Sequence, residues 1–167
     1  MTILSILHFP DPRLRQKSKL VEVFDDELRT LKDNMLETMY AAPGVGLAAV
    51  QVNQLINMMV VDISEGKNEP YCFINPELIE TDGLMKTDEG CLSVPAIYEP
   101  VDRYERIKVK AQNETGEWFE MEATGLMSVC IQHEMDHLKG KLFVDYLTEM
   151  KRKRIRKKME KFARETM

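Results

Sequence analysis

Two histidines four residues apart carry the clearest chemistry in this sequence. On a helix, His133 and His137 would lie on one face, with Glu134 beside them. Two neutral imidazoles at this spacing can bind one divalent metal ion, while the carboxylate stays off the metal and close to the position that a water would take. Two of the three histidines in the chain lie in this motif, which favours a metal site over a chance match.

A metal site of this kind needs a third protein ligand. Zinc peptidases with the same motif take it from a downstream His or Glu, but no His follows His137, and Glu149, Glu160 and Glu165 lie in or near a basic tail. Cys91 is the better candidate, because it follows a glycine in a loop-like segment and its thiolate supplies the negative charge that imidazoles lack. One cysteine and two histidines leave the fourth coordination position of the metal open for a catalytic water. A metallopeptidase remains the alternative class of enzyme.

The segment from Gly44 to Gln51 is rich in small residues. A dinucleotide-binding loop would need a preceding strand and a third glycine, and the sequence offers neither. We therefore expect the backbone to pass close to another backbone or to a ligand, with Gln51 as the one side chain there able to donate a hydrogen bond. The simpler alternative is a tight turn with a surface glutamine.

Three apolar side chains share the predicted metal-binding face of the helix. Leu126, Val129 and Cys130 are spaced three or four residues apart, in line with His133 and His137. This row would form an apolar wall beside the metal. Spacing alone leaves open whether the wall binds a substrate side chain or is ordinary core.

Asp136 lies between the two histidines in sequence but points off their face. We hypothesise that it forms an ion pair with Arg103 and so fixes the helix against the strand region. Cys72 and Cys130 fall in apolar stretches, and we expect both in the core.

Apolar periodicity and turn residues predict the elements that position these groups. A helical stripe behind an acidic first turn predicts an amphipathic helix over residues 25–40, packed on the core. The metal-binding helix should begin near Thr124 and end at Gly140. Short apolar or alternating runs predict strands at 57–62, 71–75, 107–111 and 118–123, with a hairpin turn at 113–116. This order favours an α+β fold with mainly antiparallel sheets around the central helix.

The size of the chain predicts a single domain over residues 1–167, because 167 residues with 44% hydrophobic content can bury one core but not two. The net charge of −5 hides an asymmetry: residues 151–167 carry nine Lys and Arg against two Glu, whereas the first 150 residues sum to −12. We expect the tail to form a basic helix over about residues 148–165.

Membrane and secreted classes are not favoured. No apolar run approaches the roughly 20 residues that would span a bilayer. The first ten residues lack a basic leader and a cleavage site. Three cysteines are an odd number, which fits reduced thiols. We expect a cytoplasmic protein without a membrane partner.

Three segments together resemble the signature motifs of bacterial peptide deformylases. They are Gly44 to Gln51, Glu89-Gly90-Cys91-Leu92-Ser93 and Gln132 to Leu138, in the family's order and separation. The resemblance extends over essentially the whole chain. The sequence departs from the family at Val50, where Pro or Thr is frequent, and at Ala96, where many members have Gly. Both departures concern local loop shape.

The resemblance implies an enzyme that removes the formyl group from the N-terminal formyl-methionine of new polypeptides and releases formate. Family members hold their metal with the residues that match Cys91, His133 and His137. The residue matching Glu134 moves the proton, and the amide matching Gln51 and the backbone N–H matching Leu92 stabilise the oxyanion.

By the same resemblance, Val45, Leu126, Val129 and Cys130 line the methionine pocket together with the His133 ring. Backbone groups at Val45, Gly46 and Gly90 pair with the substrate peptide in extended form.

The resemblance also implies one divalent ion per chain. We expect Fe²⁺ in the cell, with Zn²⁺, Ni²⁺ or Co²⁺ as substitutes, although this ligand set would bind zinc more tightly. The expected partners are nascent formyl-methionyl peptides and, through the basic helix, the ribosome; we expect a monomer. A metal-stabilised RNA-binding module would explain the tail but neither Glu134 nor Gln51.

Overall fold

The computed structural model describes residues 2–166, which form α-helices, β-strands and short 3₁₀ turns. The α-helices are α1 (Asp26–Ala41), α2 (Gly125–Leu138) and α3 (Glu149–Thr166). The strands are β1 (Gly46–Ala48), β2 (Met58–Val61), β3 (Tyr71–Asp82), β4 (Met85–Cys91), β5 (Val94–Arg103), β6 (Arg106–Gln112) and β7 (Trp118–Thr124).

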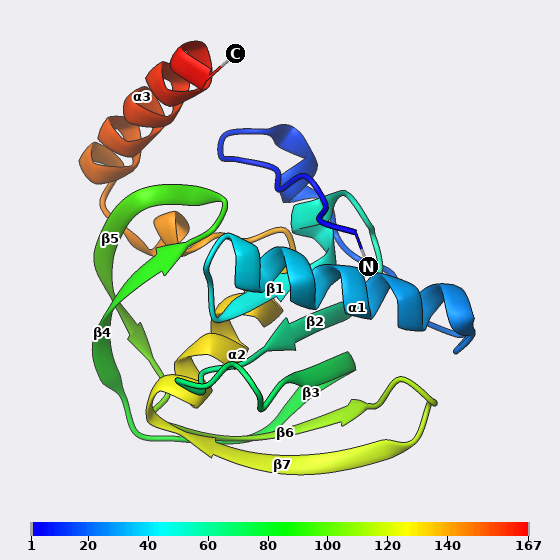
Figure 1. Cartoon of the computed structure of the whole chain (residues 1–167). Coiled ribbons are helices and arrows are strands. Elements are labelled where there is room, and N and C mark those ends of the chain that lie inside the picture. Colours follow the sequence, from blue (N-terminus) through cyan, green and yellow to red (C-terminus); the bar gives the residue numbers. More distant parts are fainter. Residues whose placement is uncertain (1, 167) are drawn as a thin grey trace.

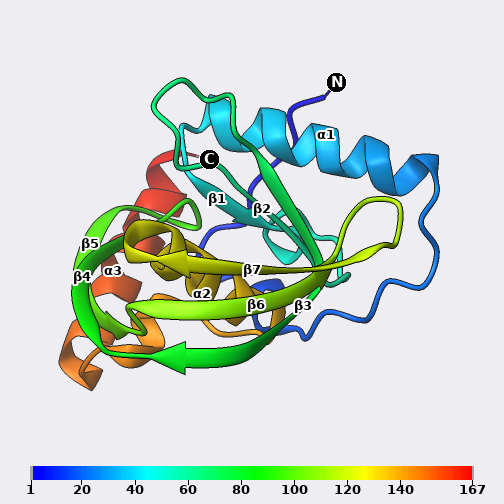
Figure 2. The ribbon, with the colours of Figure 1, turned by 90° about the horizontal axis from the view of Figure 1, so that it is seen from below.

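The strands form two antiparallel sheets around α2, as the sequence predicts. One sheet has five strands in the order β1-β2-β3-β6-β7, and the other pairs β4 with β5. Figures 1 and 2 show α2 in the middle of the molecule, with β3, β6 and β7 curving past it on one side and β4 and β5 on another. Ile131 and Met135 of α2 pack into the same core cluster as Phe73, Ile107 and Val109 of the larger sheet. The fold thus encloses the helix that carries both histidines.

Helix α1 covers the β1–β2 end of the larger sheet, and its extent agrees with the predicted helix. Asp25 caps it, since its side chain accepts a hydrogen bond from the backbone N–H of Leu28. Leu28, Met35 and Met39 are buried in a second core cluster with β1 and β2. The apolar stripe of this helix is therefore core, as expected.

The β4–β5 hairpin and β1 were not predicted, and this corrects the position of Cys91. Cys91 is the last residue of β4, and it is followed by a two-residue turn, Leu92-Ser93. The sequence hides the hairpin because β4 is mostly polar and β5 contains Pro95 and Pro100, which usually argue against a strand. A two-stranded sheet tolerates them because each strand has an unpaired edge.

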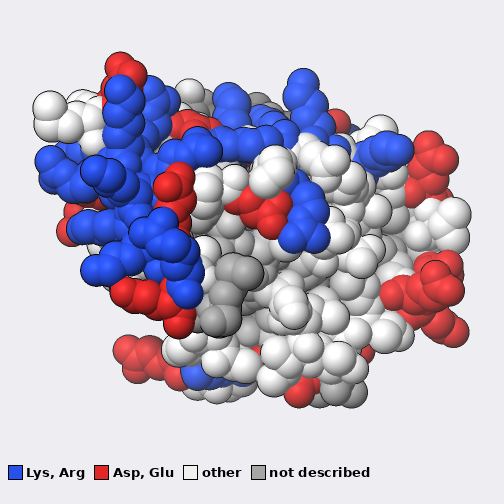
Figure 3. All heavy atoms as spheres, turned by 90° about the horizontal axis from the view of Figure 1, so that it is seen from above, with Lys and Arg blue, Asp and Glu red and all other residues white. Residues whose placement is uncertain are grey.

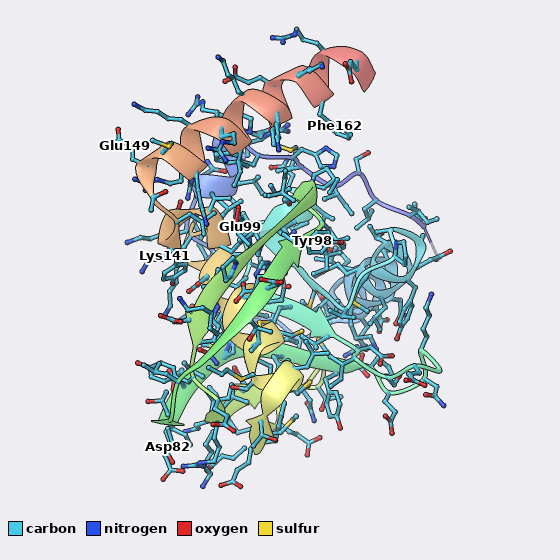
Figure 4. The ribbon with its side chains drawn as sticks, turned by 90° about the vertical axis from the view of Figure 1, so that its left-hand side faces the viewer. Asp82, Tyr98, Glu99, Lys141, Glu149 and Phe162 are labelled. Atoms are coloured by element: carbon cyan, nitrogen blue, oxygen red, sulfur yellow. The ribbon has the colours of Figure 1, made fainter. Side chains whose placement is uncertain are left out.

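Helix α3 confirms the predicted basic helix. Ile155 and Met159 are buried against a third core cluster that includes Phe9, Leu14 and Val94. The Thr148 hydroxyl accepts a hydrogen bond from the backbone N–H of Lys151 at 3.3 Å. Figure 4 shows α3 running from Glu149 to Phe162 above the β4–β5 hairpin. Within residues 2–166, no helix is both long and apolar enough to cross a membrane.

Candidate active site

The structure brings the three predicted metal ligands together. Cys91, at the end of β4, places its Sγ 3.3 Å from Nε2 of His137, and one donor atom from each of Cys91, His133 and His137 lies within 4.8 Å of the others. Ligands bound to one ion at about 2.0–2.3 Å must lie within roughly 4.6 Å of each other, so small adjustments suffice. A thiolate and two imidazoles therefore fit one divalent ion.

The electrostatics of the two histidines also suit a cation. Burial lowers the pKa of His137 well below its ordinary value, so this ring is neutral and can bind a metal. Burial alone would lower the pKa of His133 too, but the negative charges of Glu134 and Cys91 raise it well above its ordinary value. The same negative charges would favour a bound cation, which would replace the proton on Nε2 of His133.

Glu89 orients His133. The Glu89 carboxylate accepts a hydrogen bond from Nδ1 of His133 at 2.8 Å, which leaves the lone pair of Nε2 free to bind a metal. Burial raises the pKa of Glu89, but the hydrogen bonds from Arg103 and His133 outweigh it, so the net shift is downwards. Glu89 is therefore an anion that holds the ring in one orientation.

Arg103 joins Glu89 to the metal-binding helix. Its guanidinium donates to Glu89 from Nε at 2.6 Å and from Nη2 at 2.9 Å, and to Asp136 from Nη1 at 2.7 Å. The hypothesised Asp136–Arg103 pair is thus confirmed. Tyr146 completes the network, because its hydroxyl donates to Asp136 at 2.8 Å and its ring lies 4.9 Å from the guanidinium.

Glu134 is buried next to the three ligands. Its Oε2 lies 3.9 Å from Nε2 of His133, and its Oε1 has no hydrogen-bond partner among the described residues. Burial raises the pKa of Glu134 to about 7, although the charge of His133 opposes the rise. Gly46 passes so close that a Cβ there would lie 2.5 Å from Oε2, so the close neighbour of this glycine is a side chain and not the backbone or ligand that the sequence predicted.

Gln51 is not a surface glutamine, since only 1% of it is exposed. Its Oε1 accepts a hydrogen bond from the backbone N–H of Ala48 at 2.9 Å, which fixes which way the amide faces. The NH₂ group donates to Oγ of Ser93 at 2.9 Å and points at Sγ of Cys91, 3.8 Å away. A donor is therefore held beside the ligand cluster.

A cavity of about 840 Å³ opens onto this cluster. Its walls include every residue predicted to bind substrate: Val45, Gly46, Gly90, Leu126, Val129 and Cys130. Cys91, Leu92, His133 and Glu134 also line the cavity. Gln51 and His137 are not among the residues that line it.

The predicted apolar wall of α2 forms one side of this cavity. Val129 and Cys130 are buried, and Leu126 is 51% exposed. Burial raises the pKa of Cys130 to about 12, so it is a neutral thiol in an apolar surface. Cys130 also belongs to the main core cluster, as expected, while Cys72 is only partly buried at the edge of the second cluster.

Sequence reasoning missed Glu89, Ser93 and Tyr146 as members of the site. Glu89 and Cys91 are two residues apart, so a strand would place both on one face. That signal could have been found only if β4 had been recognised. Tyr146 lies in a 3₁₀ turn (Phe143–Tyr146), and no sequence pattern links it to Asp136.

Comparisons with known proteins agree with this geometry. The profile of the family described as polypeptide deformylase matches residues 3–153. The chain is 58% identical to a peptide deformylase of Azotobacter vinelandii, with 99% of both chains covered, and 57% identical to one of Acinetobacter baumannii, with 99% of this chain and 94% of the other covered.

Solved structures show the same likeness. The crystal structure of a peptide deformylase from Legionella pneumophila superposes with a TM-score of 0.95 at 46% identity and covers 99% of this chain and 98% of that one. The peptide deformylase from Ehrlichia chaffeensis in complex with actinonin gives 0.93 at 39% identity, with 96% and 98% covered. On sequence and on structure alike, this chain belongs to the polypeptide deformylase family.

Proposed function

We propose that the chain hydrolyses the N-terminal formyl group of formyl-methionyl peptides and releases formate, as its family membership implies. The observation that carries this proposal is the convergence of the Cys91, His133 and His137 cluster and the Glu134 carboxylate on one partly apolar cavity. We further propose that residues 1–167 act as one domain, as a monomer, in the cytoplasm where new chains are made.

Cys91, His133 and His137 would hold one divalent ion. When bound, that ion would polarise the formyl oxygen and lower the pKa of the attacking water. We propose Fe²⁺ as the ion in the cell, with Zn²⁺, Ni²⁺ or Co²⁺ able to replace it, because availability can override the intrinsic preference of the ligands.

Glu134 is the proposed proton carrier. It accepts a proton from water as the water oxygen bonds to the formyl carbon, and it delivers that proton to the amine nitrogen as the C–N bond breaks. A pKa of about 7 suits both steps near neutral pH. The free Oε1 of Glu134 supports this role, since no hydrogen bond from a described residue holds it.

Gln51 and Leu92 are the proposed oxyanion donors. The Gln51 amide is oriented by the hydrogen bond that its Oε1 accepts from Ala48, and the N–H that points towards Sγ of Cys91 would turn to the formyl oxygen as negative charge develops there. The backbone N–H of Leu92 lies in the turn immediately after Cys91 and would donate to the same oxygen.

Substrate binding would divide between side chains and backbone. The methionine side chain would lie against Val45, Leu126, Val129 and Cys130, which line the cavity. The peptide backbone would pair with Val45, Gly46 and Gly90 in extended form, and the position of β1 at the edge of its sheet supports this mode.

The decisive experiment measures formate release from formyl-Met-Ala-Ser. Wild-type protein should release formate, and Glu134→Gln should lose at least about 100-fold in rate while it keeps its metal, because only the proton carrier is removed. Cys91→Ser should lose metal and activity together. Full activity in Glu134→Gln, or a Cys91→Ser protein that keeps its metal, would contradict the assigned roles.

We also propose that α3 docks on ribosomal RNA near the peptide exit. Seven of the eight residues from Lys151 to Lys158 are basic, and Figure 3 shows Lys and Arg side chains crowded over α3 on one side of the molecule. The buried Ile155 and Met159 fix the helix to the body, so its charged face points outwards.

The test replaces Arg154, Lys157 and Lys158 by Gln (the α3 variant). These side chains are exposed and have no ion pair among the described residues, so the helix itself should be unaffected. Co-sedimentation with ribosomes at low salt should fall about tenfold or more, while formate release from a free peptide stays at the wild-type rate. Undiminished co-sedimentation would refute the docking role.

A further inference from the structure

A second cavity of about 350 Å³ lies on the other side of the metal-binding helix. It shares no lining residue with the catalytic cavity, and Met135 and Leu138 of α2 form part of its wall. The N-terminal segment, the residue before β2, the middle of β3 and the turn after α2 supply the rest of the lining: Lys17, Ser18, Asn57, Pro76, Lys139 and Lys141.

All charged side chains that line this cavity, among the described residues, are basic. Lys17, Lys139 and Lys141 line it, and no Asp or Glu does so among the described residues. None of the three lysines forms an ion pair within the part of the chain that the structure describes. Of the acidic groups at and after the end of α2, Asp136 pairs with Arg103 and Asp145 with Arg15. On a protein with a net charge of −5, three such lysines around one hollow create a local positive potential.

Capping of α2 does not explain these lysines. Basic side chains often neutralise the last carbonyl groups of a helix. Here backbone N–H groups already satisfy them: Asp136 O accepts from Lys139 and Lys141, His137 O from Gly140, and Leu138 O from Ser18. The ammonium groups are therefore not used by the helix end.

Ser18 is a second, independent sign of a ligand. Its backbone N–H is fixed at 2.9 Å to Leu138 O, whereas its hydroxyl oxygen is buried and has no hydrogen-bond partner among the described residues. A buried hydroxyl without a partner is costly, and because Ser18 lines the cavity, a turn of its side chain towards a bound ligand would give the hydroxyl a partner.

We propose that this cavity binds the phosphate group of an organic phosphate. Three ammonium groups and a hydroxyl donor suit an anion rich in oxygen acceptors, and Lys binds phosphate as a point charge. The volume is about twelve times the roughly 30 Å³ share of one water, so it exceeds what a phosphate alone needs. The apolar surfaces of Pro76, Met135 and Leu138 would contact the carbon part of the ligand. Figure 4 shows that Lys141 lies below the start of α3, on the same side as the basic helix.

The first test is a thermal-shift titration with inorganic phosphate at constant ionic strength, using the metal-loaded full chain in a buffer without other oxyanions. The wild-type Tm should rise and saturate. Changing Lys17, Lys139 and Lys141 together to Gln (the cavity variant) should abolish the saturable rise. The α3 variant removes the same number of charges elsewhere and should respond as wild type. Equal responses in the wild type and the cavity variant would overturn the proposal.

Ser18→Ala gives a sharper test, because its two effects have opposite signs. Without phosphate, loss of an unpaired buried hydroxyl should leave Tm unchanged or raise it. With phosphate, affinity should fall about tenfold, since a hydrogen bond to a charged group is lost. An Ser18→Ala protein that binds phosphate as tightly as wild type would exclude the hydroxyl from the site.

Competition then identifies the source of the phosphate group. If AMP displaces inorganic phosphate from the wild type and a short single-stranded RNA does not, the ligand is a small phosphorylated molecule. If the RNA competes and binds both the cavity variant and the α3 variant more weakly than wild type, the cavity extends the RNA-binding surface of α3. If neither competes, the assignment to organic phosphates is wrong.

Discussion

The Glu89 carboxylate binds both His133 and Arg103, and it has a different role for each. His133 requires an acceptor that fixes its ring, and Arg103 requires a counter-charge because only 5% of it is exposed. One buried carboxylate meets both requirements, which ties the orientation of a metal ligand to the stability of the β5–α2 contact.

Glu89→Gln should therefore affect two measurements at once. The amide keeps the size of the side chain but removes the charge, so Arg103 loses its main counter-ion and we expect a loss of about 1.5–3 kcal/mol in the free energy of unfolding. Activity or metal affinity should fall about 10–100-fold, because the ring of His133 is less firmly held. Denaturant unfolding, metal content and formate release check the three effects.

Asp136→Asn is the matched control. It also weakens a partner of Arg103, at 2.7 Å, but it leaves the Glu89–His133 contact intact. It should lower stability with less effect on activity than Glu89→Gln. If both variants lost activity equally, Glu89 would act through general stability and not through His133.

Ala96 adopts a backbone conformation that suits glycine. Its φ is +65°, and its side chain is exposed, so little packing would be lost with the methyl group. This is one of the two positions at which the sequence departs from the deformylase pattern. A left-handed conformation costs a non-glycine residue about 1–2 kcal/mol, and the extra backbone entropy of Gly offsets part of the gain.

Ala96→Gly should accordingly raise stability by about 0.5–1 kcal/mol and Tm by about 2 °C. Ala111→Gly is the control, because Ala111 is fully buried in β6 and is not among the residues with positive φ. That variant should lower Tm. A fall of Tm in Ala96→Gly would show that this position of β5 has no strain to relieve.

Among the elements, Asp62 joins the end of β2 to α1 and to the loop that follows. Its carboxylate accepts hydrogen bonds from the Tyr40 hydroxyl at 2.5 Å, from Ser64 N and Oγ at 2.9 and 2.5 Å, and from the backbone N–H of Glu69 at 3.2 Å. Burial raises the pKa of Asp62, but these hydrogen bonds lower it more, so the folded protein favours the carboxylate.

The pH dependence of stability follows from that direction. A carboxyl whose pKa is depressed in the folded state stabilises the protein fully above its unfolded pKa of about 3.9, and this contribution is lost as pH falls through the folded value. Asp62→Asn should cost about 1.5–3 kcal/mol at pH 7 and less at pH 3. Urea unfolding at both pH values checks this.

Asp26→Asn serves as the control because the Asp26 side chain is 99% exposed. It should change stability little at either pH. An Asp62→Asn cost that did not shrink between pH 7 and pH 3 would assign the effect to packing and not to charge.

Elements with strong apolar periodicity could be read from the sequence, and the hairpin that completes the site could not. Helices α1 and α2 and strands β6 and β7 carry patterns of period 3.6 or 2, and β2 is a short continuous apolar run; each was predicted to within a residue or two. Hairpin β4–β5 instead depends on tertiary pairing of polar and proline-containing strands. The three ligands could be chosen by residue chemistry, but Glu89 gained its role only once β4 placed it beside His133.

At the scale of the whole molecule, the proposed catalytic site and the proposed docking helix lie on different surfaces. The catalytic cavity lies between α2, β1 and the β4–β5 hairpin, whereas the strongest positive charge sits on α3. Electrostatic interactions between exposed charges are largely screened beyond about 8 Å at physiological salt. The charge of α3 therefore acts mainly on molecules that α3 itself contacts. Changes in salt should thus alter docking before they alter chemistry.

The short edge strand β1 has a consequence for how many proteins the enzyme can serve. Its outer side offers backbone groups, and backbone groups are the same in every polypeptide. If a substrate pairs with this edge as proposed, that part of its recognition does not depend on side chains, and selectivity is concentrated at the one residue that contacts the apolar wall. A single enzyme of this design would then accept the products of many genes, whatever sequence follows the first methionine.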